Sequence, residues 1–229
     1  MSRLILVYGQ PASGKSYALR TLDPASTFII DADKKHGLPW RGWKKNYVPG
    51  RNYSTRNMPN DIYQTLKTLG GDNEKWKHIK TIVVDGLNTT MVNRQIFDTA
   101  TGFNKWNNIA ADIYKIFDLS KDLREDLTVV INAHVKPATK EEESSVDHLK
   151  TPGSMLEKIN LESLCQYVFY AKCDKDGNYF FETSPQNSTA RSPEGCFDPT
   201  IPNDMQAAIC TIEKYENEDD DDDETEVKE

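Results

Sequence analysis

The sequence predicts an α/β protein with a mainly parallel, twisted sheet that carries helices on both faces. Four short apolar runs, each long enough for a buried strand, are separated by segments whose apolar residues recur at helical spacing. A glycine-containing loop joins the first run to the segment that follows it. Because successive parallel strands need crossover helices, this alternation favours an open sheet whose functional side chains gather at the carboxyl ends of the strands.

The expected elements can be placed in order along the chain. Strands are predicted at residues 4–8, 27–30, 81–84 and 127–131, since each run is apolar and ends in polar or turn-forming residues. Helices are predicted at residues 16–22, 60–69, 109–123 and 204–215. Two aromatic runs, 167–171 and 179–182, flank Asp176-Gly177 and predict a hairpin. Residues 135–153 are polar and mixed in charge, which predicts a long mobile loop.

The charge of the chain is concentrated at one end. Of its 229 residues, 36 are acidic and 28 are basic, and the formal net charge is −8. Residues 216–229 hold ten carboxylates and one lysine, so subtracting them leaves 26 acidic and 27 basic side chains in residues 1–215. We therefore expect one domain over residues 1–215 and a disordered acidic tail over residues 216–229.

Cysteine usage and hydrophobicity indicate an intracellular protein. Cys165, Cys173, Cys196 and Cys210 form no C-x-x-C pair and no Cys/His metal-binding spacing, which favours free thiols in a reducing compartment. The sequence contains no signal-peptide pattern and no apolar run near eighteen residues. We expect no membrane association and a cytoplasmic location, which is the host cytoplasm for a protein that is made inside a host cell.

The stretch from Gly9 to Ser16 reads GQPASGKS and fits the P-loop (Walker A) pattern G-x-x-x-x-G-K-[ST] at every fixed position. Glycines let the backbone turn so that successive N–H groups point at phosphate oxygens. Lys15 is expected to reach the β- and γ-phosphates of ATP, and the Ser16 hydroxyl to bind Mg²⁺. The predicted nucleotide-binding residues are Gly9, Gln10, Pro11, Ala12, Ser13, Gly14, Lys15, Ser16 and Tyr17.

Asp85 ends an unbroken apolar strand and is the expected Walker B carboxylate, a second Mg²⁺ ligand through water. The next residue is Gly86, whereas many ATPases place a glutamate base beside the metal-binding aspartate. A catalytic base must then come from elsewhere. Asp31 and Asp33 follow the second strand, and His134 follows the strand after Asp85.

Three strand segments carry a family resemblance. Residues 28–33 (Phe-Ile-Ile-Asp-Ala-Asp), 82–85 (Ile-Val-Val-Asp) and 130–132 (Val-Ile-Asn) resemble core strands of RecA-type recombinase ATPases. Residues 1–215 as a whole are similar to small phage-encoded RecA-core ATPases of recombination and single-strand-annealing modules. Those proteins have one P-loop, a histidine after the fourth core strand, and an arginine-containing segment before a Pro-Asn-Asp helix start, here residues 189–192 and 202–204. The resemblance implies a RecA-like ATPase that forms a homo-oligomer, as a ring or a filament.

The resemblance also implies roles for single residues. RecA-type proteins carry a glutamate base at the end of the second core strand, and Asp33 stands there, one methylene shorter. Ala133-His134 replaces their glutamine sensor, so His134 is placed to report on the γ-phosphate, with an ordinary surface histidine as the alternative. Arg191 is a candidate arginine finger acting in trans on a neighbour's site, with a plain surface arginine as the alternative.

Residues 34–56 contain seven basic side chains and no acidic one, interleaved with Trp40, Trp43, Tyr47 and Tyr53. Cations for phosphates and aromatic rings for base stacking are typical of single-stranded DNA binding. The alternative is a solvated segment with two core tryptophans. The candidate DNA-contacting residues are Lys34, Lys35, Trp40, Arg41, Trp43, Lys44, Lys45 and Arg51. The loop 135–153 ranks second, because three consecutive glutamates oppose phosphate contact.

Together these observations predict an ATP-hydrolysing protein of phage DNA recombination that binds single-stranded DNA in a nucleotide-dependent way and promotes annealing or strand pairing. A single-strand-binding protein or another recombination protein is a candidate partner. The alternatives are a non-hydrolysing nucleotide-dependent switch or assembly protein, and another P-loop enzyme of phage DNA metabolism. The acidic tail is expected to compete with nucleic acid or to engage a basic partner.

Overall fold

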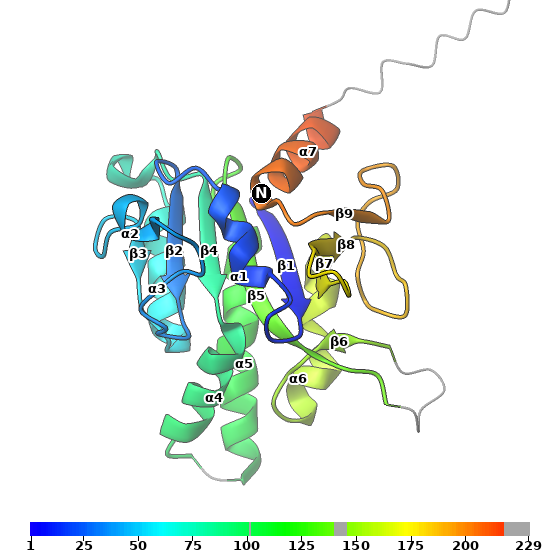
Figure 1. Ribbon diagram of the computed structural model, residues 1–229. Coiled ribbons are helices and arrows are strands. Elements are labelled where there is room, and N and C mark those ends of the chain that lie inside the picture. The colour runs from blue at the N-terminus through cyan, green and yellow to red at the C-terminus, as the bar shows by residue number, and fades with distance from the viewer. Residues whose placement is uncertain (101, 140–145, 218–229) are drawn as a thin grey trace, which may run out of the picture.

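The computed structural model describes residues 1–100, 102–139 and 146–217, and shows the predicted α/β sheet (Figure 1). The strands lie in the order β3-β2-β4-β5-β1-β7-β8-β9, and neighbours from β3 to β7 are parallel. Strands β8 and β9 continue the sheet antiparallel, and β6 pairs antiparallel with β5 outside this path. Their bounds are β1 Arg3–Gly9, β2 Thr27–Asp31, β3 Tyr53–Ser54, β4 Thr81–Asp85, β5 Thr128–Lys136, β6 His148–Leu149, β7 Tyr167–Cys173, β8 Tyr179–Glu182 and β9 Thr200–Pro202.

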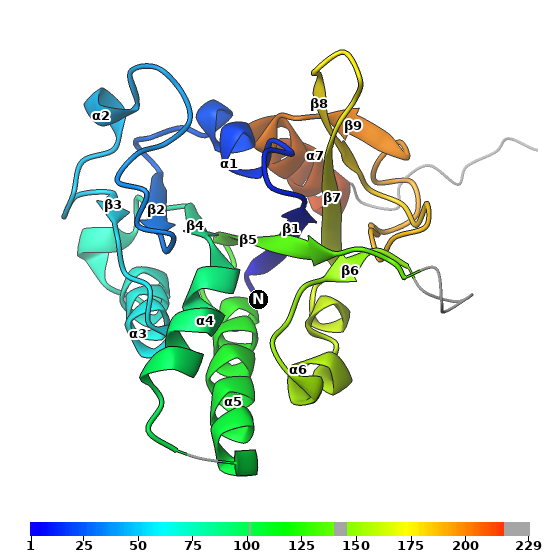
Figure 2. The ribbon, with the colours of Figure 1, turned by 60° about the horizontal axis from the view of Figure 1, so that its bottom comes forward.

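Helices cover both faces of the sheet. Helices α3, α4, α5 and α6 lie on one face, whereas α1 and α7 lie on the other (Figures 1 and 2). Short 3₁₀ turns at Leu19–Thr21, Glu74–Trp76 and Leu161–Leu164 complete the described elements. The helices are α1 Lys15–Ala18, α2 Trp43–Asn46, α3 Pro59–Gly70, α4 Leu87–Phe97, α5 Gly102–Lys121, α6 Ser154–Ile159 and α7 Met205–Asn217.

The alternation of side chains along the central strands explains their unbroken apolar sequences. In β1, Leu4 and Leu6 pack into the apolar cluster beneath α3 and α5, whereas Ile5 and Val7 pack into the cluster beneath α1 and α7. A strand covered on both faces needs apolar residues at every position. This double coverage buries β1 and leaves the ends of the strands as the place for polar side chains.

The structure corrects the predicted loop at residues 135–153. Strand β5 continues to Lys136, and His148 pairs with it across the antiparallel β5–β6 ladder. Helix α4 is a further element that the sequence did not predict, because its first turn contains Asn88, Thr89 and Thr90, which have low helix propensity. Tertiary packing on α3 and α5 stabilises it instead. Residues 140–145 lie outside the described residues.

The boundary of the acidic tail also differs from the prediction. Helix α7 runs through Asn217, and Glu216 belongs to the domain. The Glu216 carboxylate accepts hydrogen bonds from Arg3 Nε at 2.5 Å and from the Tyr167 hydroxyl at 3.0 Å. Residues 218–229, the remainder of the predicted tail, lie outside the described residues.

Two further sequence-based expectations can be compared with the described part of the chain. In it, Cys165, Cys173, Cys196 and Cys210 are free thiols. Among the described residues, no helix has both the length and the apolar character needed to cross a bilayer.

Candidate functional site

The strand order brings the carboxyl ends of β1, β4 and β5 together. Because β5 lies between β1 and β4, Gly9 is level with His134 on one side, and Asp85 is level with Asn132 on the other. A cavity of about 380 Å³ opens at this edge. Its lining consists of residues 11–16 together with Asp33, Lys35, Asp85, Gly86, Asn132, Ala133 and His134.

The loop between β1 and α1 has the backbone geometry of a phosphate cradle. Ala12 and Gly14 have positive φ angles of 62° and 89°, so the chain curls, a backbone form that in other proteins presents N–H groups to an anion. A Cβ at Gly9 would overlap the Ala171 carbonyl oxygen, which is why glycine is needed there. Buried Lys15 donates from Nζ to the carbonyls of Gly9 at 2.8 Å and Gln10 at 2.7 Å. Nζ also lies 3.5 Å from the Ser13 hydroxyl oxygen, a long and weak contact that a phosphate oxygen can replace.

Ser16, Asp85 and Asn132 form one hydrogen-bonded group at the base of the cavity. Asp85 Oδ1 accepts from Ser16 Oγ and from Asn132 Nδ2, each at 2.9 Å. Burial raises the pKa of Asp85, while these two hydrogen bonds oppose the shift. Asn132 Oδ1 is buried and has no hydrogen-bond partner among the described residues. A hydroxyl, a carboxylate and an orphaned amide oxygen are hard oxygen donors, which fits Mg²⁺ held jointly with nucleotide phosphates.

Asp33 lies in the same cavity. Its carboxylate pairs with Lys35 Nζ at 2.6 Å and accepts a hydrogen bond from the Thr89 hydroxyl. Gly86 makes room for it, because a Cβ at Gly86 would overlap Asp33 Oδ1. Gly86 also has a φ of 110°, which other residues rarely adopt. The Asp33 carboxylate therefore lies directly beside Gly86, the residue that follows Asp85.

Asp31, the other candidate base on this strand, has a different environment. It is 1% exposed and accepts hydrogen bonds from the Tyr53 hydroxyl at 2.6 Å and the His36 N–H at 3.1 Å. These bonds fix the turn after β2, and Asp31 is absent from the lining of the cavity. Of the two aspartates, only Asp33 faces the phosphate cradle.

His134 lines the cavity and is held by its main chain. Its N–H donates to Asn88 Oδ1 at 2.6 Å, and its carbonyl accepts from the Lys150 N–H at 2.8 Å. Burial, followed by the charge of Lys15, lowers the pKa of the imidazole. Nδ1 is buried and unpartnered among the described residues. A neutral imidazole in this place can hydrogen-bond a terminal phosphate without adding positive charge.

Two tyrosines whose contact was not predicted from the sequence lie beside the loop between β1 and α1. The Tyr179 ring packs on Gly14, where an added Cβ would come within 2.7 Å of it. Tyr17 lies against Tyr179, with ring centroids 5.6 Å apart and a 54° angle between the planes. The Arg20 guanidinium lies 3.9 Å from the centroid of Tyr17. Because Tyr179 comes from the distant β7–β8 hairpin, no local pattern could have predicted this contact.

The basic aromatic segment 34–56 divides into two kinds of residue. Tyr47 and Tyr53 are each 2% exposed and belong to the apolar core, so their predicted role in base stacking is wrong. Trp40 and Trp43 are half-buried against the same cluster and contact these tyrosines edge-on or tilted. The exposed basic residues among the DNA-binding candidates are Lys34, Lys35, Arg41, Lys44, Lys45 and Arg51. Of these, Lys35 lines the cavity at the carboxyl ends of β1, β4 and β5, which we call the phosphate cavity.

Arg191 lies outside the cavity and is bound within its own chain. Its guanidinium donates to the main-chain carbonyls of Glu162 at 2.5 Å and Cys165 at 2.6 Å. These bonds tie the segment after β8 to the 3₁₀ turn before β7. These hydrogen bonds give Arg191 a structural role within its own chain. Its role as an arginine finger in a neighbouring subunit stays a prediction.

Comparison with known proteins identifies the family. A family model described as an AAA domain matches residues 1–191 of the chain. None of the curated proteins compared with the chain matches it. The matched residues include the P-loop, Asp33, Asp85 and His134. Since the match covers 191 of the 229 residues, the chain belongs to the AAA domain family of P-loop ATPases.

Proposed function

We propose that this protein hydrolyses ATP with Mg²⁺ and uses the nucleotide to control binding of single-stranded DNA in a phage recombination module, where it promotes annealing or strand pairing as a homo-oligomer. The observation that carries the enzymatic part is the convergence of Asp33 and Asp85 on one cavity with Lys15 and Ser16. Two carboxylates with different partners allow one to serve the metal and the other to serve as base.

Each residue of the cavity has a distinct part in this proposal. The N–H groups of the loop and Lys15 hold the phosphates and offset the charge that develops on them. Ser16 and Asp85 hold Mg²⁺, which supplies further charge neutralisation when it is bound. Asn132 fixes the Asp85 carboxylate through its Nδ2–H. Asp33 accepts a proton from the attacking water, and His134 donates to the terminal phosphate.

One observation supports the alternative of a non-hydrolysing switch. Asp33 is already paired with Lys35, so an attacking water must compete with this ammonium for the carboxylate. Although burial opposes the shift, the hydrogen bond with Asp33 raises the pKa of Lys35. Turnover measured with and without single-stranded DNA separates the two functions: hydrolysis above the background supports the enzyme, and tight ATP binding without hydrolysis supports the switch.

We place the base of the nucleotide at Tyr17 and Tyr179. The end of the cavity that holds Asp33, Asp85 and His134 suits the γ-phosphate, and it lies on the β4–β5 side of β1. A triphosphate that runs along the loop therefore directs its base toward the opposite side, where β7 and β8 lie. The Tyr179 ring stands there against Gly14.

Replacing Tyr179 with alanine is expected to weaken ATP binding roughly tenfold, because stacking of a base on an aromatic ring contributes about 1–3 kcal/mol. Tyr179→Phe keeps the ring and should bind ATP like the parent. The measurement is calorimetric titration with ATP and, separately, with inorganic tripolyphosphate, which has no base. Equal losses for both ligands would show that Tyr179 supports the loop and does not contact the base.

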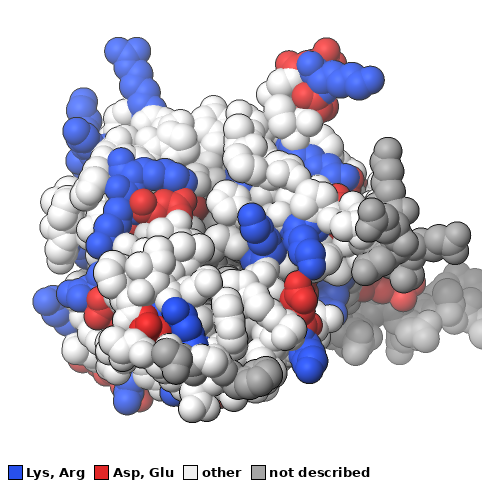
Figure 3. Space-filling view, turned by 90° about the horizontal axis from the view of Figure 1, so that it is seen from below, with Lys and Arg blue, Asp and Glu red and all other residues white. Residues whose placement is uncertain are grey.

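The DNA-binding part of the proposal depends on the exposed cations of residues 34–56. The face at the carboxyl ends of the strands carries several separate groups of basic side chains with acidic side chains between them (Figure 3). Lys44 and Lys45 are exposed on α2, and Trp43 beside them is half-buried. Such an arrangement supports contacts to a few phosphates and not a continuous basic groove.

Replacing Lys44 and Lys45 with glutamate is expected to weaken binding to a single-stranded oligonucleotide and to flatten its salt dependence. Every phosphate that the variant no longer binds should reduce the slope of log K against log salt by roughly 0.7. The measurement is fluorescence anisotropy across a salt series with a non-hydrolysable ATP analogue. Glutamates at Lys67 and Lys75, which are exposed on other elements, provide a charge-matched control. If the Lys44/Lys45 variant and this control bind equally well, residues 34–56 are not the DNA site.

Deleting residues 218–229 should have the opposite effect. These residues carry nine carboxylates and one lysine, which compete with DNA phosphates for the same cations. The deletion leaves Glu216 and its bonds to Arg3 and Tyr167 intact. We expect tighter DNA binding, most clearly at low salt where screening is weak. The gain should shrink when Lys44 and Lys45 are glutamates; an undiminished gain would mean that the tail acts elsewhere.

A further inference from the structure

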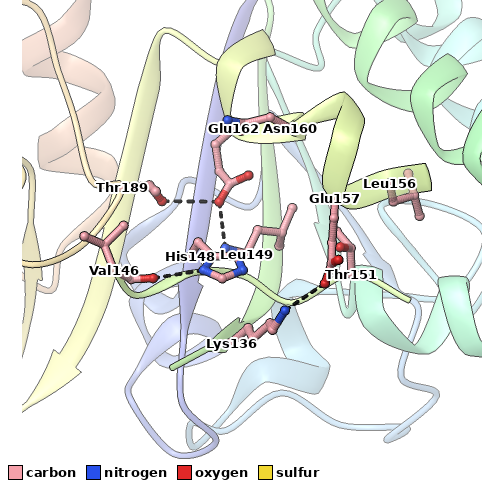
Figure 4. A pocket seen from close by; sticks show the side chains of 10 residues that line it. All are labelled: Lys136, Val146, His148, Leu149, Thr151, Leu156, Glu157, Asn160, Glu162 and Thr189. Atoms are coloured by element: carbon pink, nitrogen blue, oxygen red, sulfur yellow. Dashed lines mark hydrogen bonds and ion pairs between the residues drawn. The ribbon is translucent and has the colours of Figure 1, made fainter. Parts of the chain in front are cut away.

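A second cavity, of about 420 Å³, lies between the β5–β6 hairpin and the segment from α6 to the following 3₁₀ turn (Figure 4). It shares no lining residue with the phosphate cavity. Its apolar walls are Val146, Leu149 and Leu156. The remaining lining side chains are polar or charged: Lys136, His148, Thr151, Glu157, Asn160, Glu162 and Thr189.

Glu162 is the distinctive residue of this cavity. It is only 7% exposed, and its carboxylate extends from the 3₁₀ turn toward the hairpin (Figure 4). Oε1 accepts from the Leu149 N–H at 2.7 Å and from Thr189 Oγ1 at 3.3 Å. Within residues 1–100, 102–139 and 146–217, neither a hydrogen bond to Oε2 nor an ion pair of Glu162 is present. Glu162 as a residue is thus more than nine-tenths buried, while its Oε2 has no partner among these residues and is open to solvent in the cavity.

The two hydrogen bonds of Glu162 do not explain its charge. Both need only a neutral acceptor, and a glutamine carbonyl would accept them equally well. Removing a carboxylate from water is unfavourable unless a cation or hydrogen-bond donors compensate for the lost hydration. The neighbouring Arg191 guanidinium donates instead to the main-chain carbonyls of Glu162 and Cys165. The charge is therefore available to a group from outside the chain.

The charges around the cavity define what that group can be. At the mouth, Lys136 Nζ is neutralised by Glu157 Oε1 at 2.7 Å, with both side chains more than two-fifths exposed. With this pair cancelled, Glu162 is the acidic residue of the lining that has no basic partner among the described residues. Such a lining repels phosphates and carboxylates and attracts a cation. It also argues against DNA as the ligand of this hairpin.

We propose that this cavity binds an arginine side chain of a protein partner, with Glu162 Oε2 as the acceptor of its guanidinium. Guanidinium is more weakly hydrated than an ammonium group and costs less to bury, which suits a nearly enclosed acceptor. Its additional N–H groups can reach the polar lining residues Asn160 and Thr151. The apolar walls fit the aliphatic stem, which buries its methylene groups while the charged end finds its partner.

The test uses the full chain and N-acetyl-arginine amide as the probe, followed by two-dimensional NMR of the backbone amides. The expected result is saturable shifts at Leu149 and Thr189, whose groups bond Glu162. N-acetyl-citrulline amide has nearly the same shape without the charge, and should cause no such shifts. Binding should be weakened tenfold or more in Glu162→Gln, which retains an acceptor for Leu149 and Thr189, and little in Glu157→Gln at the mouth.

Three results would overturn the proposal. The first is the absence of shifts with the arginine probe, and the second is equal shifts with the citrulline probe. The third is equal losses in the Glu162 and Glu157 variants, which would indicate diffuse electrostatic attraction. Because the parent protein alone distinguishes arginine from citrulline, a Glu162→Gln chain that does not fold leaves the test intact. None of these measurements depends on nucleotide binding.

Discussion

Replacing Lys15 with alanine is expected to abolish ATP hydrolysis, with turnover lower by roughly 10²–10³-fold or more, and to weaken ATP binding strongly. The Lys15 ammonium is the buried cation of the phosphate cradle, and it also bonds the carbonyls of Gly9 and Gln10. Alanine removes both the charge that faces the phosphates and the bonds that shape the loop. Hydrogen bonds to charged groups contribute about 1.5–3 kcal/mol each, so the combined loss should be large.

The measurements are phosphate release and calorimetric ATP binding, with thermal unfolding as a check that the fold survives. Lys67→Ala removes an exposed lysine on α3 and should leave all three unchanged. Asp85→Asn should cut turnover as well, but reduce ATP binding less, because it affects the metal and not the loop. Undiminished hydrolysis by a folded Lys15→Ala variant would remove the P-loop from the proposed mechanism.

Replacing Asp33 with asparagine is the second change expected to have a large effect. Turnover should fall by about 10²–10⁴-fold, the usual contribution of a positioned general base, while ATP affinity stays near that of the parent. Asparagine has the same shape and still accepts from Thr89, but it cannot take a proton from water. The check is kcat from single-turnover hydrolysis together with a separate binding titration.

The outcome also distinguishes the remaining candidates for the base. Normal turnover by Asp33→Asn would move the role to His134, because Asp31 is bound to Tyr53 and His36 and lies outside the cavity. Asp33→Glu is a complementary test, since it restores the reach of the glutamate in RecA-type proteins. We expect Asp33→Glu to hydrolyse ATP faster than the parent. If Asp33→Glu is inactive while Asp33→Asn is active, Asp33 is not the catalytic base.

Much of the fold was predictable from the sequence because its signals are local. The apolar runs before Gly9 and before Asp85 mark strands covered on both faces, and the structure confirms them as β1 and β4. Carboxyl ends of parallel strands share one edge of a sheet, so the P-loop and Asp85 were expected to meet. Ser16 Oγ and Asp85 Oδ1 lie 2.9 Å apart. The weakly patterned start of α4 gave no comparable signal.

Only the tertiary structure decided which other side chains join the site. Asn132 reaches Asp85 because β5 is inserted between β1 and β4, an order that hydrophobic periodicity does not encode. Asp33 and Gly86 likewise follow two different strands, β2 and β4, and only the pairing of these strands brings them into contact.

Tertiary packing also gives different environments to residues that the sequence alone does not distinguish. Tyr47 and Tyr53 stand in a basic stretch typical of DNA binding, yet packing buries them. Glu162 resembles any helix-surface glutamate until its 3₁₀ turn is packed against the β5–β6 hairpin. Exposure and charge compensation depend on contacts between segments far apart in the chain. Sequence alone therefore determined the P-loop and the aspartate at the end of β4, because both are local patterns. The packing of distant segments decided which other carboxylates and aromatic rings lie beside them.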